Sequence, residues 1–383
     1  MGLFQKPQRA RWSKGIGQKQ YTTREGLCQS DTLFFLFLTS VNLRRDTTKG
    51  AKTMRKGWLG NGILLLAAAV WGFGFAAQDL AGQHLGAFSI LTLRFLMGSF
   101  VLLPVIAVID KAKGGKRPLL SKREGRWRVG FTKTELVGGT VCGAVVSLAA
   151  LLQQVGISSE TGDAAAASFI TALYVIFVPI LGLFLRRRVG ANVWIGVGIA
   201  VLGFYLLTAN IVFSDLSLGG IFSAFFVGFA LSPSDILLLI CAVLYAVHIL
   251  AVDRFVDRVD GVRLSCIQFF VGFLLSLPMM LILERPSPEA LLAGLWPVVY
   301  LGVVSTGVGY TLQVVGQRYT DPAIAPVVLS LESVFGALGV ALVTGEYKTP
   351  IQYVGCAAVL LAVIIAQLPG KKAKAEAKKS KEA

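Results

Sequence analysis

The feature that most constrains this chain is a series of ten long runs with almost no charged residues. Each run has about twenty residues, the length that an α-helix needs to cross the hydrocarbon core of a bilayer. Lipid offers the backbone no hydrogen-bond partners, so only helices and closed barrels cross it, and the runs lack the alternating pattern of barrel strands. The predicted helical spans cover residues 58–78, 87–109, 136–157, 164–185, 191–210, 234–252, 264–283, 293–316, 322–344 and 350–369.

The overall composition agrees with a membrane protein. Of the 383 residues, 55% are hydrophobic and 15% are charged, whereas roughly a quarter of the residues of an average soluble domain are charged. This composition excludes a disordered chain, a collagen and an ordinary cytosolic domain. The predicted fold is therefore an all-α polytopic membrane protein with ten transmembrane helices.

The net charge of +16 is concentrated in the two tails and in alternate loops. If the N-terminus lies inside, the inner segments carry 34 Lys and Arg residues, and the outer loops carry only Arg285 and Lys348. Because Lys and Arg collect in cytoplasmic loops, both termini are predicted to be cytoplasmic, in a multi-pass protein of the cell (plasma) membrane. The basic tails lack the interleaved aromatic residues that stack on nucleic-acid bases, so we predict the lipid bilayer as a partner and no nucleic acid.

Two segments do not fit the series of spans. Residues 216–231 are apolar but short and interrupted by Gly and Ser. An eleventh span there would place the three arginines of loop 253–263 outside, so we predict an outer interfacial or re-entrant segment. Residues 1–53 are polar and basic and are predicted to be disordered. Met54 precedes two basic residues and the first span, which suggests the hypothesis that 1–53 is an over-called start.

The two halves of the chain can be aligned with each other at two constant offsets. Five spans fall in each half, and because five is odd, the second half enters the membrane upside down relative to the first. Inverted five-helix repeats of this kind are a common construction of secondary transporters. At an offset of 174 the pairs are Trp71 and Tyr245, Asp79 and Asp253, Phe95 and Phe269, Gly98 and Gly272, Pro104 and Pro278; at 159 they are Gly143 and Gly302, Gln154 and Gln313, Thr161 and Thr320, Gly196 and Gly355.

This repeat divides the chain into five predicted parts. The longer basic loop 110–134 accounts for the difference between the two offsets. The parts are a basic N-terminal extension at 1–56, a first repeat at 57–210, an outer connecting segment at 211–233, a second repeat at 234–369 and a basic cytoplasmic tail at 370–383.

Ionisable groups inside the spans are the first candidates for function, because a charge at the bilayer centre costs about 3 kcal/mol on insertion scales. Glu332 lies about ten residues into the ninth span, so its carboxyl could contact a solute ammonium group or take up and release a proton. Arg94 lies in the second span and stays charged, so it needs a carboxylate, carbonyl groups or water. We expect a packing or gating role for Arg94 before direct contact with substrate. Its repeat counterpart is the neutral Gln268.

The remaining candidates are polar or aromatic side chains in the spans. A lone histidine on an apolar helix, such as His248, is more often a satisfied hydrogen-bonding group than a titrating one. The repeat-related Gln154 and Gln313 suggest hydrogen bonds between helices. Four aromatic residues are candidates for lining a cavity and stacking on a solute, namely Trp71, Phe75, Tyr174 and Tyr245.

Motifs of soluble enzymes are missing from the sequence. Two histidines exclude an HExxH motif, and there is no GxxxxGK[ST] loop for ATP. The five cysteines are far apart and form no CxxC pair. We therefore predict no catalytic residues, no metal site and no cofactor, and a chain without an ATP site would run on a solute gradient or couple to an ion.

Five runs of the sequence resemble the EamA-like family of the drug/metabolite transporter superfamily. They are GILLLAAAVWGFGFAAQ, LRFLMGSFVLLP, DAAAASFITALYVIFVPILG, SDILLLICAVLYA and SLESVFGALGVALVTGE. The resemblance covers about 57–369 and implies ten helices with cytoplasmic termini. It also implies export or exchange of small metabolites, often amino acids, through a central cavity lined mainly by the first, third, fourth, sixth, eighth and ninth spans.

The leading hypothesis is a secondary transporter that exports or exchanges amino acids or related amphiphilic solutes by alternating access, with proton coupling through Glu332 as one variant. A nucleotide-sugar or sugar-phosphate exchanger is the alternative, although such anions would call for more cavity cations than Arg94. Alternatives of another class are an intramembrane enzyme, for which no catalytic cluster is evident, and a sensor or scaffold that uses its basic tails. The sequence leads to no prediction of oligomeric state.

Overall fold

The computed structural model describes residues 51–114, 118–123, 126–160, 162, 164–185, 189–208, 232–344 and 349–368. The chain divides into two units, 1–45 and 46–383, and all of the described residues belong to the second. The predictions for 1–50, for the segment 216–231 and for the tail 370–383 lie outside the described residues.

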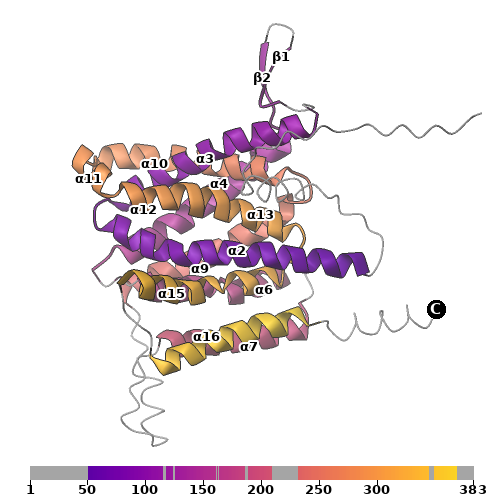
Figure 1. Cartoon of the computed structure of the whole chain (residues 1–383), viewed down its shortest axis with the longest axis vertical. Coiled ribbons are helices and arrows are strands. Elements are labelled where there is room, and N and C mark those ends of the chain that lie inside the picture. The colour runs from indigo at the N-terminus through magenta and orange to yellow at the C-terminus, as the bar shows by residue number, and fades with distance from the viewer. Residues whose placement is uncertain are drawn as a thin grey trace, which may run out of the picture. The chain divides into compact units, whose positions relative to one another are not determined.

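The described residues are almost entirely helical (Figure 1). The first half contains α2 (Ala51–Gly82), α3 (Ala87–Ala112), α4 (Lys133–Ile157), α5 (Ala164–Ala172), α6 (Tyr174–Phe184) and α7 (Ala191–Thr208). The second half contains α9 (Pro233–Phe255), α10 (Gly261–Met279), the π-helix η1 (Met280–Glu284), α11 (Pro288–Ala293), α12 (Leu295–Val299), the π-helix η2 (Tyr300–Tyr310), α13 (Thr311–Gln317), α14 (Ala325–Leu329), α15 (Glu332–Thr344) and α16 (Pro350–Gln367).

Several helices begin where short polar side chains cap them. Thr132 accepts a hydrogen bond from the Glu135 amide at the start of α4, and the Glu135 carboxylate accepts one from the Thr132 amide in return. Ser232 and Asp235 form the same reciprocal capping box at the start of α9. These caps satisfy backbone amides that have no partner inside the helix, so they define where each span enters the bundle.

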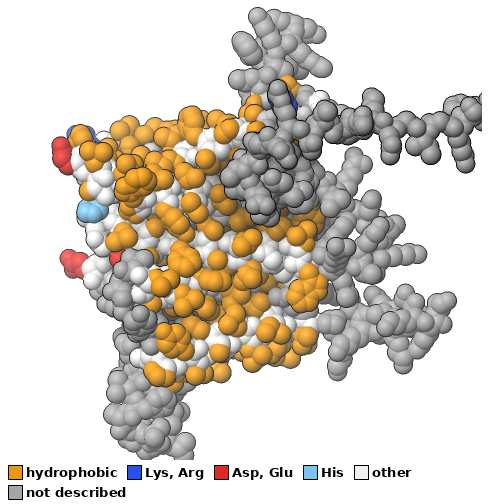
Figure 2. All heavy atoms as spheres, viewed as in Figure 1, with side chains coloured by type: hydrophobic (Ala, Val, Ile, Leu, Met, Phe, Trp, Pro, Cys, Tyr) orange, Lys and Arg blue, Asp and Glu red, His pale blue; other side chains and the backbone are white. Residues whose placement is uncertain are grey.

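Eight helices of the described residues are long and apolar enough to cross a membrane, judged by length and composition. The apolar parts of α7 and α16, which correspond to the fifth and tenth predicted spans, are shorter. Hydrophobic side chains cover the face of the molecule drawn in Figure 2, and the few charged side chains drawn in colour lie at or near its edges. Phe184 and Trp296 are about four-fifths exposed, as expected where side chains meet lipid rather than water.

The helices depart from the predicted spans in detail. The fourth predicted span is two helices that break at Leu173, and the ninth is two helices that break at Ser330 and Leu331. These breaks fall at nearly equivalent positions of the two repeats. The first helix begins at Ala51, before the predicted start of its span. These boundaries were missed because no long polar stretch marks them in the sequence.

A short antiparallel hairpin is an exception to the all-helical prediction. Strands β1 (Leu120–Arg123) and β2 (Arg126–Val129) pair in the basic loop between α3 and α4, with Leu120 opposite Val129. The sequence predicts only a basic connection here, because the charged residues leave no clear apolar alternation. Each strand has four residues, so the hairpin leaves the helical architecture of the spans unchanged.

The two repeats pack on each other reciprocally. The first helix of one half packs along the third span of the other: α2 lies along α12, η2 and α13, while α9 lies along α4. Likewise α3 packs on its counterpart α10, and α7 packs on its counterpart α16. Such reciprocal pairing is expected when a pseudo-two-fold axis relates the two halves.

The equivalent helices α2 and α9 run in opposite directions. Gly82 at the end of α2 lies against Ser158 just after α4, so α2 and α4 run in parallel. Gly138 near the start of α4 lies against Phe255 at the end of α9, so α4 and α9 run antiparallel. The two repeats are therefore inverted relative to each other, as the odd number of predicted spans per half requires.

Contacts between individual residues follow the sequence alignment of the repeats. The equivalent rings of Phe95 and Phe269 stack with their centroids 6.2 Å apart. Gly143 on α4 packs against Val271 on α10, and its counterpart Gly302 packs against Met97 on α3, the counterpart of Val271. Because glycines at these points let the helices approach closely, α10 packs on α4 at the position equivalent to that where α3 packs on η2.

Candidate functional site

A cavity lies in the middle of the helical bundle, between the two repeats. The empty space between its walls is about 440 Å³, a figure that includes the open space at its mouth. Its lining comes from the six spans that the family resemblance implies, with Arg94 of α3 in addition. The lining residues are Trp71, Phe75, Gln78, Arg94, Gln153, Thr171, Tyr174, Tyr245, Ile249, Ser305, Tyr310, Gln313 and Glu332.

Arg94 brings a buried guanidinium group to this cavity, with only 3% of the residue exposed. Its Nε donates to Thr306 Oγ1 at 3.0 Å, Nη1 donates to Gln78 Oε1 at 3.3 Å, and Nη2 donates to Ser305 Oγ at 3.5 Å. All three partners are neutral. The guanidinium group therefore keeps its positive charge at the cavity wall, and none of these three partners supplies a negative charge to neutralise it.

Glu332 brings a buried carboxyl group to the same cavity, and it is the first residue of α15 after the break in the ninth span. Its counterpart in the broken fourth span is Leu173, and the next residue, Tyr174, is the first of α6. The Tyr174 hydroxyl lies beside the Glu332 carboxyl, yet neither it nor Glu332 Oε1 forms a hydrogen bond of standard geometry. The breaks in the fourth and ninth spans therefore lie close together at Glu332, whose Oε1 is free to accept a hydrogen bond.

Aromatic rings form one wall of the cavity. The rings of Trp71 and Tyr310 lie 4.6 Å apart between centroids, and Trp71 Nε1 donates to the Ser305 carbonyl at 3.2 Å. That carbonyl belongs to the π-helix η2. A flat apolar solute could therefore lie against rings that are themselves held in place by hydrogen bonds.

A chain of hydrogen bonds crosses from this wall to the other side of the cavity. Tyr310 donates from its hydroxyl to the Tyr245 hydroxyl at 3.1 Å, which donates to Gln153 Oε1 at 3.4 Å. Gln153 Nε2 donates in turn to Thr171 Oγ1 at 3.2 Å. The chain links η2, α9, α4 and α5, so it couples helices from both repeats around the cavity.

Seven of the nine residues predicted from the sequence line this cavity: Arg94, Glu332, Trp71, Phe75, Tyr174, Tyr245 and Gln313. The other two lie outside its lining. Gln154 donates to the Gln78 carbonyl and to Ser158, as expected for a hydrogen bond between helices. His248 contacts Gln268 behind the cavity, with 3.2 Å between His248 Nε2 and Gln268 Oε1. Glu332 and Arg94 form no ion pair with each other among the described residues.

The prediction missed six lining residues. Gln78 follows Trp71 by seven positions, so the helical period would have placed it on the same face. Gln153 was passed over for its neighbour Gln154, which has the clearer repeat counterpart. Ser305 and Tyr310 lie in η2, where a period of 3.6 does not hold. Thr171 and Ile249 carry no comparable signal. No group of three or more His, Cys, Asp or Glu side chains suited to a metal occurs within the described ranges.

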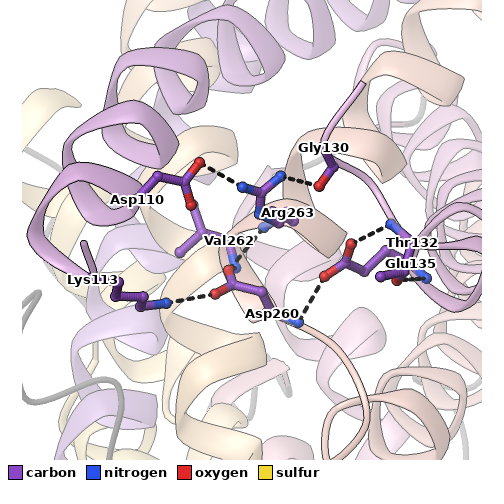
Figure 3. Close-up of polar contacts among 8 residues, drawn as sticks. All are labelled: Asp110, Lys113, Gly130, Thr132, Glu135, Asp260, Val262 and Arg263. Atoms are coloured by element: carbon purple, nitrogen blue, oxygen red, sulfur yellow. Dashed lines mark hydrogen bonds and ion pairs between the residues drawn. The ribbon is translucent and has the colours of Figure 1, made fainter. Parts of the chain in front are cut away.

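A second polar cluster lies at the end of the bundle where α3 ends and α10 begins (Figure 3). Arg263 Nη2 donates to Asp110 Oδ2 at 2.6 Å, and Nη1 donates to the Gly130 carbonyl at 2.6 Å. Asp260 caps α10, and its amide donates to Glu135 Oε1 at 3.3 Å. The cluster therefore joins the first repeat to the second at the base of the basic hairpin.

Comparisons with known proteins agree on one kind of molecule. The model of the EamA-like transporter family matches residues 58–209 and 232–367, one match for each repeat. A protein named "Uncharacterized transporter" from Archaeoglobus fulgidus is 29% identical over 311 residues, which are 80% of this chain and 84% of that protein. Another of that name from Clostridium kluyveri is 21% identical over 328 residues, 84% of this chain and 96% of that protein.

A solved structure titled "Crystal structure of protein" has the same fold. It aligns with a TM-score of 0.59 and 18% identity, covering 82% of this chain and 98% of that one.

Proposed function

This chain belongs to the EamA-like transporter family, and from that premise we propose that it moves small amphiphilic zwitterions, such as amino acids, across the plasma membrane by alternating access. Family membership and the names of its relatives indicate a multi-pass membrane transporter of a small-molecule solute rather than an enzyme. The observation that carries the finer proposal is that the buried guanidinium group of Arg94 and the buried carboxyl group of Glu332 line one cavity and form no ion pair with each other among the described residues.

A zwitterion is the solute that best complements this cavity. A guanidinium group binds a carboxylate through paired donors, and a carboxylate binds an ammonium group. The rings of Trp71 and Phe75 would receive the apolar part of the solute between these two charges. Burying either charge without its partner costs several kcal/mol, so a solute that carries both signs lowers both costs at once.

Alternating access is supported by the inverted repeats and by the breaks in the fourth and ninth spans. Interrupted helices at the midplane are the usual binding elements of transporters with inverted repeats. The proposed topology has ten spans, with α7 and α16 as the fifth and tenth, and both termini in the cytoplasm. The distribution of Lys and Arg supports this orientation, since 34 fall in the segments that it places inside.

Proton coupling is proposed as the driving reaction. The Glu332 carboxyl lines the cavity and has an unpartnered oxygen. If it binds either a proton or the solute ammonium group, but not both, then solute and proton cross in opposite directions. This competition is the simplest antiport mechanism that one carboxyl group can support.

The alternative of a nucleotide-sugar or sugar-phosphate exchanger is less well supported. Such solutes carry two or more negative charges, and Arg94 is the one Lys or Arg among the residues that line the cavity. An intramembrane enzyme, or a sensor that acts through its basic tails, would not explain why Arg94 and Glu332 line one buried cavity.

The decisive experiment is solute counterflow in proteoliposomes with a labelled panel of amino acids, polyamines, purines and sugar phosphates. Saturable uptake of amino acids alone, absent from empty liposomes, is the expected result. Saturable uptake of sugar phosphates alone would overturn the zwitterion in favour of the exchanger. Uptake of polyamines alone would leave Arg94 without a role. Silence from folded protein across the whole panel would count against transport of any of these classes.

A further inference from the structure

The equivalent residues Arg94 and Gln268 have different surroundings in this structure. Arg94 lines the cavity and contacts α2, the first helix of its own repeat, through Gln78. Gln268 contacts α9, the first helix of its own repeat, through His248, and does not line the cavity. The two halves therefore use one sequence position in two ways, with one copy in the cavity and the other in a separate polar site.

The site around Gln268 has unused hydrogen-bonding capacity. His248, Gln268 and Ser265 are all fully buried, and His248 Nδ1, Gln268 Nε2 and Ser265 Oγ have no partner. If the Gln268 amide is flipped, its NH2 group donates to His248 Nε2, its oxygen becomes the free acceptor and His248 Nδ1 becomes the free donor. Either way the pair presents one free donor and one free acceptor. Buried polar groups without partners cost free energy in lipid, so these atoms are expected to meet water or solute in another state.

Tyr310 separates this polar site from the cavity. One side of its ring contacts Trp71 in the cavity wall. The same ring contacts His248 with centroids 5.9 Å apart and Phe269 with centroids 5.8 Å apart, both edge to face. A rotation of the Tyr310 side chain, or a shift of η2, would therefore connect the polar site with the cavity.

Arg94 and Gln268 lie at matching depths from opposite ends of the bundle. Each is seven residues beyond the first residue of its helix, Ala87 or Gly261, which corresponds to roughly 10 Å along the axis. The helices run antiparallel, because Asp110 at the end of α3 binds Arg263 at the start of α10 (Figure 3). The cavity arginine thus belongs to one half of the membrane and Gln268 to the other.

Contacts that have a counterpart in the other repeat need not change when the halves exchange conformations. The pairs Gly143 with Val271 and Gly302 with Met97 are of this kind. The hydrogen bond from Arg94 to Thr306 has no such counterpart. The equivalent bond would join Gln268 to Ser147, but Gln268 contacts His248 instead. The difference between the two facing states should therefore be found around Arg94 and Gln268.

We propose that His248, Gln268 and Ser265 form a second solute site, closed in this structure and open when the transporter faces the other side of the membrane. This inference rests on the proposed function and extends it. The second site is neutral where the first has Arg94, so it binds the carboxylate end of a zwitterion more weakly. Solute would then pass from a charged site to a neutral one and be released.

The test is the labelling of single cysteines by a charged, membrane-impermeant methanethiosulfonate. The five native cysteines are replaced by alanine or serine, and one cysteine is introduced by R94C, Q268C, S265C or, as the control, L264C. Leu264 is a neighbour of these residues on α10, is equally buried and lies in an apolar cluster. S265C changes one atom, so it provides a second position if Q268C folds poorly. Labelling is measured in right-side-out and inverted vesicles.

The expected result is that R94C reacts from one side of the membrane, and that Q268C and S265C react from the opposite side. Each should react roughly tenfold faster than L264C, because reactivity follows the population of the open state. Q268C and S265C reacting no faster than L264C, or from the same side as R94C, would overturn the second site and leave the proposed function intact. Protection of R94C from both sides would instead overturn the proposed cavity, and the second site with it.

Discussion

Asp110 and Glu284 occupy equivalent positions 174 residues apart in the two repeats. Each accepts hydrogen bonds from the first turn of the second helix of the other repeat, α10 for Asp110 and α3 for Glu284. Asp110 accepts from Arg263 Nη2 at 2.6 Å near the start of α10. Glu284 accepts from the Phe88 and Ser89 amides at 2.8 and 2.7 Å and from Ser89 Oγ at 2.6 Å, in the first turn of α3. Arg263 and Ser89 are themselves equivalent, so one contact occurs twice, and α3 and α10 are tied together at both ends.

The ion pair between Asp110 and Arg263 should contribute more to stability than its exposed neighbour. The pair is more than nine-tenths buried on both sides, whereas Lys113 and Asp260 are 36% and 23% exposed. Asp110→Ala leaves a buried guanidinium group without its carboxylate, and we expect a loss of about 3 kcal/mol in the free energy of unfolding. Lys113→Ala should cost less than about 1 kcal/mol. Thermal unfolding in detergent compares the two, and equal losses would refute the ranking.

Arg94 should set the affinity for the carboxylate end of the solute. Arg94→Gln removes a charged donor group, and we expect a roughly tenfold or greater loss of affinity for a zwitterion, since hydrogen bonds to charged groups contribute about 1.5–3 kcal/mol. The carboxamide analogue of the same solute serves as the control, because it lacks the negative charge. Counterflow at graded concentrations measures both. An equal loss for the acid and the amide would mean that Arg94 acts through packing alone.

Glu332 should account for any pH dependence of transport. Glu332→Gln keeps the shape of the side chain and removes its proton exchange, so we expect initial rates that no longer respond to a pH gradient across the vesicle membrane. Glu332→Asp keeps a carboxyl group and should retain part of the response. Counterflow rates with and without the gradient test the pair, and a Glu332→Gln variant that responds like the natural chain would exclude this residue as the coupling group.

Gly72 should be essential to the position of Glu332. A Cβ atom at Gly72 would lie 2.7 Å from the Glu332 carbonyl oxygen and would also meet Phe335 Cβ. Gly72→Ala must therefore push α2 away from α15, at a cost of about 1–3 kcal/mol in stability, with reduced counterflow. The same change at Gly62 on the same helix meets nothing within 4 Å, so Gly62→Ala should be close to neutral. Comparable losses from both variants would show that the close contact at Gly72 is not responsible, because alanine is the better helix former at both positions.

The architecture could be predicted from the sequence further than the site could. Long apolar runs indicate spans because lipid leaves the backbone no other solution, and the equivalence of Phe95 and Phe269 reappears as a contact between their rings. The breaks at Leu173 and Leu331 were missed because both positions are apolar and lack the Gly or Pro that usually marks a break.

Within the site, charge was the reliable signal. Arg94 and Glu332 were found because ionisable groups are rare in spans. Which of Gln153 and Gln154 faces the cavity depends on helix rotation, and a difference of one residue turns a side chain by about 100°. Tyr310 depends on the local π-helical geometry of η2, which no periodicity in the sequence announces.

The double tie between α3 and α10 has a consequence for how such a chain can diverge after a gene duplication. Phe95 and Phe269 occupy equivalent positions and contact each other, so a change in one copy must suit the other. The repeat counterparts of Arg94 and Glu332 are the neutral Gln268 and Leu173, so at these positions the two copies differ in charge. A duplicated transporter built in this way can acquire new solutes through one half while its paired halves preserve the frame.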